Sequence, residues 1–392
     1  MRKRALLVII VLSLVIGLIG CGKKSSSSSA SGDTANYTSK LTIADLFTDR
    51  DLEQSVDTSD ATTYTVSDGE NISITEEGVY VISGTAKNVS IIVNVDDETK
   101  VQLVLADLTI INDSKPCIYV KNADKVFITM TGDNNLSVTG TFEADGNINT
   151  DAVIFSKDDI TLNGSGSLTI SSTDNGITGK DDIKITGGTI TINCVNDAIE
   201  ANNSIAINDG NITINSKKDG MHAEYSDDDT VGYIYIAGGT INITATDDAL
   251  HATTVLQIDD GTITTNSREG LEATYVQING GAINITASDD GINAASQSSS
   301  YTVTIEINGG YVTIDMGSGD TDAIDSNGNI YVNGGTINIT AQSSFDYDGE
   351  AEYNGGKIIV NGTETNEITN QMMGGPGGGQ GNMNNNRGGK GR

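Results

Sequence analysis

The chain has 392 residues, 36% of them hydrophobic, and a formal net charge of −31. So large an acidic excess argues against nucleic acid and anionic lipid as partners, because their phosphate groups would repel the protein. Tryptophan is absent, so tyrosine is the side chain left for stacking on sugar rings.

The N-terminus has the pattern of a bacterial export signal. Basic residues occupy positions 2–4, and an almost unbroken apolar run follows from Ala5 to Ile19. A short apolar run with a basic flank is typical of a cleaved signal rather than a membrane-spanning helix. The run ends in Leu18-Ile19-Gly20-Cys21, which resembles the bacterial lipobox, in which the cysteine is diacylated and becomes the new N-terminus. An ordinary cleaved signal and a membrane-anchoring helix are the alternatives.

We therefore expect a lipoprotein signal peptide over residues 1–20 and a lipid anchor, such as palmitate, at Cys21. Residues 21–36 are rich in serine and are expected to form a flexible tether. Loss of the three basic signal residues would take the net charge from −31 to −34. The folded part would then lie outside the bacterial cell membrane, held to it by the anchor.

Residues 37–62 precede the repetitive part of the chain. A short helical turn is expected around residues 43–53, where it would cap the open end of the core, as solenoid termini require. From residue 63 the chain has strand-like runs, of which Val101–Leu105 is an example. At the other end, residues 369–392 consist largely of Gly, Asn and Met and are expected to be disordered.

Two cysteines remain after Cys21, and each lies in an apolar, strand-like run. A chain of this length does not need a disulfide to build a core. We therefore expect Cys117 and Cys194 to be buried free thiols, with a disulfide as the alternative. The spacing of the cysteines does not fit a zinc site.

Gly-Gly and Asp-Gly pairs recur through the second half of the chain. The pairs are Gly187-Gly188, Asp209-Gly210, Gly238-Gly239, Asp260-Gly261, Gly280-Gly281, Gly309-Gly310, Gly334-Gly335 and Gly355-Gly356. Successive pairs are 22, 29, 22, 20, 29, 25 and 21 residues apart. Each is followed by a strand in which β-branched residues alternate with Thr or Asn, a pattern typical of one buried and one exposed face. Glycine suits the bend, because positive φ is open to it.

A second landmark follows most glycine pairs by nine residues and consists of an acid, a small residue and an aliphatic, as in Asp197-Ala198-Ile199. A third strand, such as Ile183–Ile185, leads to the next pair. Three short strands and three bends in about 22 residues make one coil of a solenoid, and parallel crossovers are almost always right-handed. The sequence therefore predicts an all-β, right-handed parallel β-helix over residues 63–368, in one domain.

The two 29-residue steps carry their extra residues at the same point of the coil. One insertion lies near residues 224–233 and the other near residues 295–303. Equivalent points lie on one edge of a solenoid, and three coils at one strand spacing each put the insertions roughly 14 Å apart. We expect them to wall a groove; harmless surface loops are the alternative.

Four stretches resemble a known family, namely Leu46–Leu52, Gly78–Thr85, Ala152–Ile160 and Gly176–Ile183. The family is that of the β-helical carbohydrate-binding proteins of clostridial cell surfaces, which are related in fold to family 9 pectate lyases. The likeness spans about residues 40–365, and its most specific part is the repeated Ser/Gly-Lys-Asp-Asp-aliphatic segment. The resemblance implies a calcium-binding β-helix that binds plant-type polysaccharides, including cellulose and acidic pectic chains, without catalysis.

Acidic side chains recur at the second landmark of successive coils. They are Asp197, Asp219, Asp248, Glu269 and Asp290. Equivalent positions stack at about 4.8 Å, and carboxylates that close must protonate or bind a cation. Lys218 and Arg268, one residue earlier in the coil, can pair with these acids, so a salt-bridge ladder is the alternative to a bound ion. The column one residue earlier also holds Asp247 and Asp289, so two cations face seven acids in the two columns together. This surplus favours calcium, which prefers hard oxygen ligands.

A neighbouring bend carries a second acidic group, which is formed by Asp158-Asp159 and Asp181-Asp182 on consecutive coils. A lysine precedes each pair and offsets part of its charge. We predict calcium at these four carboxylates as well, and the family resemblance supports that prediction.

An outward column lies three residues past each acid, and we predict that it contacts sugar hydroxyls. Its members are Glu200, His222, His251, Glu272, Asn293 and Asp325, and the nearby tyrosines Tyr225, Tyr275 and Tyr301 are the candidates for stacking on sugar rings. The alternatives are an exposed polar stripe without a ligand and, for the two histidines, a metal-binding pair.

The sequence thus predicts a monomeric, calcium-binding, non-catalytic surface lipoprotein that binds cellulose or an acidic pectic glycan. A calcium-dependent pectate lyase is the first alternative; its base would be a Lys or Arg beside the metal, and Lys217, Lys218 and Arg268 are the basic residues in place. A structural stalk or adhesin is the second, suggested by the Ser-rich tether and the Gly/Asn-rich tail.

Overall fold

The computed structural model describes residues 41–317 and 321–371. The predicted signal peptide, Cys21, the tether and residues 372–392 of the predicted tail lie outside the described residues. The described part has 34 strands and two four-residue helices, so the all-β prediction is confirmed. Among its helices none is long and apolar enough to cross a membrane.

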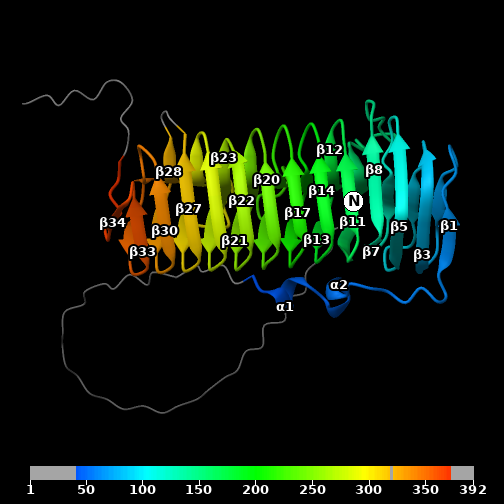
Figure 1. Cartoon of the computed structure of the whole chain (residues 1–392), viewed down its shortest axis with the longest axis horizontal. Helices are drawn as coiled ribbons and strands as arrows, with labels where there is room; N and C mark the ends of the chain where they lie inside the picture. The colour runs from blue at the N-terminus through cyan, green and yellow to red at the C-terminus, as the bar shows by residue number, and fades with distance from the viewer. Residues whose placement is uncertain (1–40, 318–320, 372–392) are drawn as a thin grey trace, which may run out of the picture. The chain divides into compact units, whose positions relative to one another are not determined.

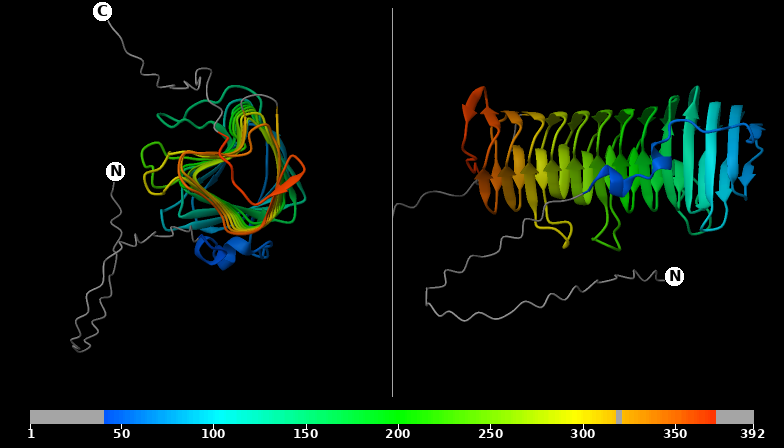
Figure 2. Two further views of the ribbon diagram at one scale, coloured as in Figure 1. Left: turned by 90° about the vertical axis from the view of Figure 1, so that its left-hand side faces the viewer. Right: turned by 90° about the horizontal axis from the view of Figure 1, so that it is seen from below.

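The strands wind into a solenoid with three faces, as the end-on view in Figure 2 shows. Within each face the strands pair in parallel with their counterparts on the next coil, and the pairing of β33 with β34 is antiparallel. Face A consists of β1 (Thr62–Thr65), the first parts of β3 (Gly78–Lys87) and β5 (Lys100–Asn112), β7 (Lys125–Thr131), β10 (Asp159–Gly164), β13 (Asp182–Ile185), β16 (Ser204–Ile207), β19 (Tyr233–Ile236), the second parts of β21 (Asp248–Ile258) and β23 (Glu269–Ile278), β26 (Thr304–Ile307), β29 (Asn329–Val332) and β32 (Ala351–Tyr353).

Face B is the broad sheet that faces the viewer in Figure 1. It consists of the second parts of β3 and β5, then β8 (Asp133–Val138), β11 (Ser167–Ser171), β14 (Thr189–Asn193), β17 (Asn211–Asn215), β20 (Thr240–Thr244), β22 (Thr262–Ser267), β24 (Ala282–Ala287), β27 (Tyr311–Met316), β30 (Thr336–Thr340) and β33 (Lys357–Val360), with β34 (Thr363–Thr365) at its end. Face C consists of β2 (Ile72–Ile74), β4 (Ile91–Asn94), β6 (Ile118–Asn122), β9 (Ala152–Ser156), β12 (Asn175–Gly179), β15 (Ile199–Ala201), β18 (Met221–Ala223), the first parts of β21 and β23, β25 (Asp290–Ala294), β28 (Asp322–Ser326) and β31 (Asp346–Tyr347).

The alternating strands after the glycine pairs stack in register along face B. Ile190 pairs with Ile212, Ile212 with Ile241, and Ile241 with Ile263. These inward side chains are fully buried, and each contributes about 1.5–3 kcal/mol through removal of its apolar surface from water. Cys117 and Cys194 are buried free thiols, as expected, and burial raises the pKa of both.

The second glycine of each pair turns the chain into face B with a positive φ. Gly188 has φ +87°, Gly239 has φ +92° and Gly310 has φ +82°. A Cβ atom on Gly239 would lie 2.9 Å from the carbonyl oxygen of Gly210 on the preceding coil. Both the backbone conformation and the close stacking of coils therefore require glycine here.

Residues 41–54 form a strap that contains α1 (Ile43–Leu46) and α2 (Asp49–Leu52) and packs along face A (Figure 1). The Gln257 side chain donates to the Leu41 carbonyl at 2.9 Å, and the Gln54 amide donates to the Thr186 carbonyl at 2.9 Å. The expected cap over the open end of the core is therefore wrong in position: the strap covers the flank of several coils. Its polar side chains find their partners on face A, along the side of the solenoid.

Asp51 fixes the strap to face A. The Asp51 carboxylate lies 2.6 Å from the Lys125 ammonium and accepts a hydrogen bond from the Thr161 hydroxyl at 2.6 Å. It also accepts from the Thr48 amide at 2.9 Å, so that one side chain caps α2 and binds two strands of face A. Burial raises the pKa of Asp51, but the hydrogen bonds from Lys125, Thr161 and Thr48 outweigh it and bring the pKa down to about 2.

Candidate functional site

The predicted acid column lies at the corner between faces B and C, and most of its carboxylates are buried. Asp197, Asp219 and Asp248 are each less than 5% exposed. One oxygen of Asp197 accepts the Asp219 backbone amide at 3.0 Å, and one oxygen of Asp219 accepts the Asp248 amide at 3.0 Å. Each side chain thus joins two coils through a charge-assisted hydrogen bond.

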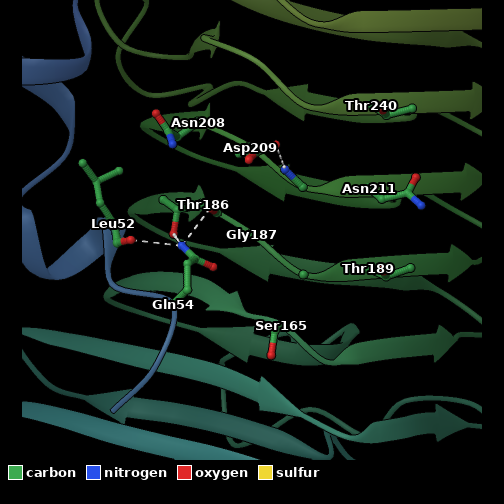
Figure 3. A pocket seen from close by; sticks show the side chains of 12 residues that line it. Leu52, Gln54, Ser165, Thr186, Gly187, Thr189, Asn208, Asp209, Asn211 and Thr240 are labelled. Atoms are coloured by element: carbon green, nitrogen blue, oxygen red, sulfur yellow. Dashed lines mark hydrogen bonds between the residues drawn. The ribbon is translucent and has the colours of Figure 1, made fainter.

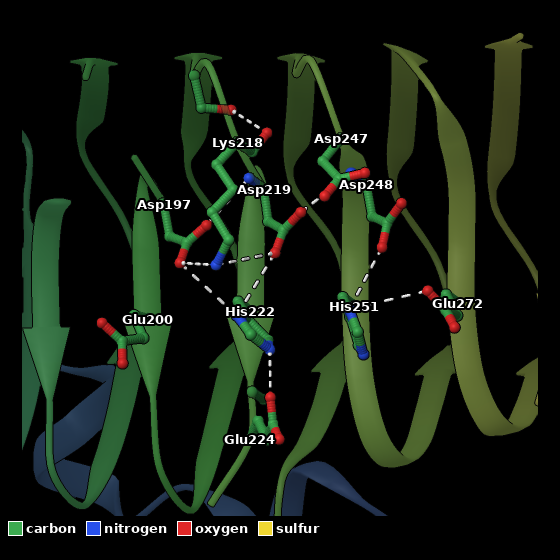
Figure 4. A network of polar contacts seen from close by, with 12 residues as sticks. Asp197, Glu200, Lys218, Asp219, His222, Glu224, Asp247, Asp248, His251 and Glu272 are labelled. Atoms are coloured by element: carbon green, nitrogen blue, oxygen red, sulfur yellow. Dashed lines mark hydrogen bonds and ion pairs between the residues drawn. The ribbon is translucent and has the colours of Figure 1, made fainter. Parts of the chain in front are cut away.

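Basic side chains offset much of the remaining negative charge of the column, and Figure 4 shows Lys218 beside Asp197 and Asp219. Lys218 lies 2.8 Å from Asp197 and 3.7 Å from Asp219. Arg268 is 3.1 Å from Asp248 and 2.5 Å from Glu269, and it also pairs with Asp247 and Asp289. The salt-bridge ladder that the sequence allowed is therefore present.

The same contacts bear on the candidate lyase bases. Burial lowers the pKa of Lys218, but its hydrogen bond to Asp197 outweighs this effect and raises the pKa above its usual value. The acids around Arg268 likewise outweigh burial and raise its pKa. A general base needs a pKa near the working pH. The raised pKa values keep both side chains protonated, which does not suit that role.

Asp290 is the last acid of the column, and none of the ion pairs described above involves it. Its carboxylate accepts the Asp322 amide at 3.4 Å. Burial, followed by the charge of Asp325, raises the pKa of Asp290 to about 7. Asp290 therefore takes up a proton at a higher pH than an exposed aspartate does.

The Asp-Asp bend lies at the corner between faces C and A. Strand register places Asp159 beside Lys125 and Asp182 beside Ser204. Carboxylate oxygens of Asp159, Asp181 and Asp182 lie within 4.8 Å of one another, and all three side chains are half-buried. Burial, then Asp182 and Asp181, raises the pKa of Asp159 to about 7. Asp158, the fourth predicted ligand, instead accepts the Ala123 amide at 3.0 Å.

Two further polar side chains lie close to the three carboxylates of the bend. The Ser204 hydroxyl donates to Asp182 at 2.6 Å, and the Asn203 side-chain amide donates to Asp181. The set contains hydroxyl, amide and carboxylate groups and no sulfur or imidazole, which is the donor set that calcium prefers. The residues present fit a calcium ion.

The predicted outward column is in register along face C. Glu200 pairs with His222, and His222 with His251. The stack continues through Glu272 to Asn293 and then to Asp325. It is not open to solvent throughout, because Gln297 of the second insertion accepts from or donates to both His251, at 2.9 Å, and Glu272, at 2.6 Å.

The two insertions, which were expected to wall a groove, contact each other. The Ser299 amide donates to the Asp229 carboxylate at 2.9 Å, and the Ser298 hydroxyl donates to the Asp229 carbonyl oxygen at 2.5 Å. Short polar side chains at both loop tips satisfy each other's backbone groups, and this draws the loops together over face C.

The three predicted tyrosines differ in their surroundings. Tyr225 is 37% exposed on the first insertion. Tyr275 is only 4% exposed, and its hydroxyl donates to Glu306, so its ring is not a surface platform and the prediction for it needs correction. The Tyr301 ring packs 6.2 Å from the Tyr275 ring, measured between centroids. The second insertion buries Tyr275, which is why sequence alone did not show its burial.

Face B has a polar surface that the sequence analysis did not single out as a site. Its outward side chains from β14 to β30 include Thr189, Thr191, Asn211, Thr213, Thr240, Asn242, Thr262, Thr264, Asn284, Thr313, Thr336 and Asn338. We call these residues the Thr/Asn face. Of the residues in these seven strands, Asp315 is the single charged one. The alternation of Thr and Asn was visible in the sequence. The sequence did not show that the acidic residues lie at the corners of the solenoid and leave this face almost uncharged.

A groove of about 630 Å³ adjoins the Thr/Asn face where the strap ends (Figure 3). Leu52 and Gln54 of the strap form one side, and Thr189, Asn211 and Thr240 belong to the other. Gln54 donates to the Thr186 carbonyl and accepts from the Gly164 amide at 3.0 Å, and these bonds hold it in place on its side of the groove. The groove thus extends the Thr/Asn face toward face A with polar, mostly uncharged groups.

The chain is similar in sequence and fold to known proteins. The profile of a family described as carbohydrate-binding domain-containing protein matches residues 68–323 and 273–373. A protein of that description from Acetivibrio thermocellus is 39% identical over 253 residues, which cover 63% of this chain and 85% of the relative. A solved structure, described as a gadolinium derivative of the polysaccharide lyase-like protein from C. thermocellum, is 32% identical with a TM-score of 0.50, covering 52% of this chain and 90% of that one.

Proposed function

Because this chain belongs to the family of carbohydrate-binding domain-containing proteins, we propose that it is a non-catalytic, calcium-binding surface lipoprotein that binds an extended polysaccharide. We also propose a right-handed winding of the solenoid with coils of about 22 residues, since crossovers between parallel strands almost always have that hand. Acylation of Cys21 would hold the protein, as a monomer, on the outer side of the bacterial cell membrane.

The observation that carries the proposal is the near absence of charge on the Thr/Asn face of a chain with net charge −31. Threonine hydroxyls and asparagine amides both donate and accept hydrogen bonds, as sugar hydroxyls do. The seven strands from β14 to β30 extend about 29 Å at one strand spacing per coil. A neutral, extended glycan such as cellulose can form hydrogen bonds with these hydroxyl and amide groups. Its binding would not require the removal of water from charged side chains.

Tyr311 adds an aromatic contact to the Thr/Asn face. It lies at the start of β27 and is 51% exposed. An exposed tyrosine ring offers an apolar surface to a sugar ring and a hydroxyl to its substituents. It supplies on face B the stacking that the buried Tyr275 does not supply on face A.

An acidic glycan such as pectate meets a different situation. The net negative charge of the protein repels a polyuronate, and the acid column already holds Lys218 and Arg268. We therefore expect pectate to bind only when calcium bridges its carboxylates to those of the protein.

Affinity electrophoresis tests the proposal directly. Gels containing hydroxyethyl cellulose, xylan or pectate are run with calcium and with chelator. Retardation by the neutral glucan under both conditions, and by pectate only with calcium, is the expected result. Migration unchanged in every gel would contradict the proposal and favour the structural stalk or adhesin.

Calcium is proposed at Asp159, Asp181 and Asp182, with Asp158 on the same bend and the acid column as a weaker site. Thermal melting with calcium and with chelator should differ for the natural protein, because an ion that binds only the folded state stabilises it. The Asp181→Asn/Asp182→Asn variant should lose most of that difference. The exposed pair Asp96→Asn/Asp97→Asn, which precedes β5 two coils away, is the matched control and should keep it. Equal losses in both variants would contradict the assignment.

Lyase activity is the second outcome to be measured. Incubation with pectate and calcium, followed by ultraviolet absorbance of unsaturated product, should give no signal above a heat-denatured sample. The reason is that Lys218 and Arg268 are held as cations in the salt-bridge ladder. A signal that Lys218→Ala abolishes would make the protein a lyase instead.

A further inference from the structure

The two histidines of the chain lie side by side on face C and have no part in the proposed function (Figure 4). His222 belongs to β18 and His251 to β21, and strand register pairs them directly. Their ring centroids are 4.7 Å apart, with 31° between the ring planes. Both side chains are largely buried, at 13% and 20% exposed.

The outer nitrogen of each ring meets an oxygen atom. His222 Nε2 lies 3.0 Å from a Glu224 carboxylate oxygen. His251 Nε2 lies 2.9 Å from the Gln297 carbonyl oxygen, whose assignment follows from the Gln297 amide donating to Glu272 at 2.6 Å. Both Nε2 atoms therefore carry a proton and donate it. A histidine that binds a metal through one nitrogen is normally oriented by such a bond from the other.

The inner nitrogens also face carboxylates: His251 Nδ1 is within hydrogen-bond distance of Asp248, whereas the distances from His222 Nδ1 are too long for good hydrogen bonds. His222 Nδ1 is buried without a hydrogen-bond partner, 3.4 Å from Asp219 Oδ2 and 3.6 Å from Asp197 Oδ2. Hydrogen bonds of this type are about 2.7–3.2 Å long. Two ligands of a tetrahedral zinc ion, each about 2.0–2.2 Å from the metal, are about 3.4 Å apart. The separation of His222 from Asp219 is that of two ligands of one ion.

We propose that Asp219, His222 and His251 form a site for a first-row transition-metal ion of the zinc class. One ligand atom from each residue lies within 4.8 Å of the other two. Two imidazoles and a carboxylate are a zinc-type donor set, whereas calcium prefers oxygen ligands alone. A fourth position is left for water or for Asp248, whose Oδ2 is 3.2 Å from His251 Nδ1.

Lys218 competes with the ion for Asp219. Its ammonium is 3.7 Å from Asp219 and 2.8 Å from Asp197. The Lys218 side chain is 45% exposed, so it can keep its contact with Asp197 while Asp219 turns to the metal. Removal of this positive charge should therefore tighten metal binding, an effect that a purely structural histidine pair would not produce.

Zinc titration of the purified full chain, in competition with a chromophoric chelator and with excess calcium present, tests the site. We expect one zinc ion per chain at micromolar or tighter affinity, and a visible absorption band typical of tetrahedral geometry when cobalt replaces zinc. His222→Gln/His251→Gln should weaken zinc binding at least tenfold. Lys218→Met should tighten it severalfold.

Melting of the zinc-free variants shows whether the histidine variant folds. The calcium-dependent melting shift and retardation by the neutral glucan should remain in it, so failure of this site is distinguishable from failure of the proposed function. If the double variant does not fold, Lys218→Met decides alone. Unchanged zinc affinity in Lys218→Met, or zinc binding in the histidine variant equal to that of the natural protein, overturns the site.

Discussion

The surroundings of each carboxyl group determine whether it is ionised or tends to be protonated. In Asp51 three donors outweigh burial and keep the group ionised, whereas at Asp159 and Asp290 burial and neighbouring acids favour the protonated form. A count of acids in the sequence does not separate these cases. What separates them is whether a cation or a backbone amide reaches each side chain.

Asp51→Asn should destabilise the protein by about 3–5 kcal/mol, because it leaves the buried Lys125 ammonium without its counter-ion. Chemical denaturation at neutral pH measures the loss. The exposed neighbour Asp49→Asn is the matched control, and it should change the free energy of unfolding by about 0.5 kcal/mol or less.

The same variant predicts a dependence on pH. The folded pKa of Asp51, about 2, lies below the unfolded value, so its contribution is present above about pH 4 and is lost as the pH falls toward 2. The stability difference between the natural protein and Asp51→Asn should shrink over that interval. A difference that stays constant from pH 5 to pH 2.5 would contradict the assigned ion pair.

At the scale of elements, the coils could be predicted from a local, repeating sequence pattern, whereas the position of the strap could not. Glycine pairs, alternating strands and the acid landmark recur every coil, so the register columns could be predicted from spacing alone. The strap joins residues far apart in the chain, such as Asp51 with Thr161 and Leu41 with Gln257, and leaves no periodic signal. The meeting of the two insertions depends in the same way on contacts that only the folded chain brings together.

The glycine bends give a prediction at this scale. Gly239→Ala should cost about 1–3 kcal/mol, because alanine is strained at φ +92° and its Cβ would press on the Gly210 carbonyl. Gly69→Ala is the control: it has φ +73° but open space around the Cβ position, so it should cost about 1 kcal/mol. Equal losses would show that close stacking of coils is not what requires glycine at Gly239.

At the scale of the whole molecule, charge is sorted by surface. Acidic side chains gather at the two corners of face C, while the Thr/Asn face carries almost none. The sugar contacts predicted from the sequence lie on face C, where strand register aligns them but the second insertion covers His251 and Glu272. The nearly uncharged surface is on face B. The alternation of its strands was predicted correctly from the sequence, but no binding function was predicted for them.

The affinity for a soluble neutral glucan, compared between two variants of equal added charge, tests this account most directly. Thr191→Glu/Asn242→Glu puts two carboxylates in the middle of the Thr/Asn face, whereas Thr63→Glu/Thr139→Glu puts them on exposed positions elsewhere. We predict at least a tenfold loss of affinity in the first variant, about 1.4 kcal/mol, and no change in the second. Equal affinity in both variants would contradict the assignment of polysaccharide binding to face B.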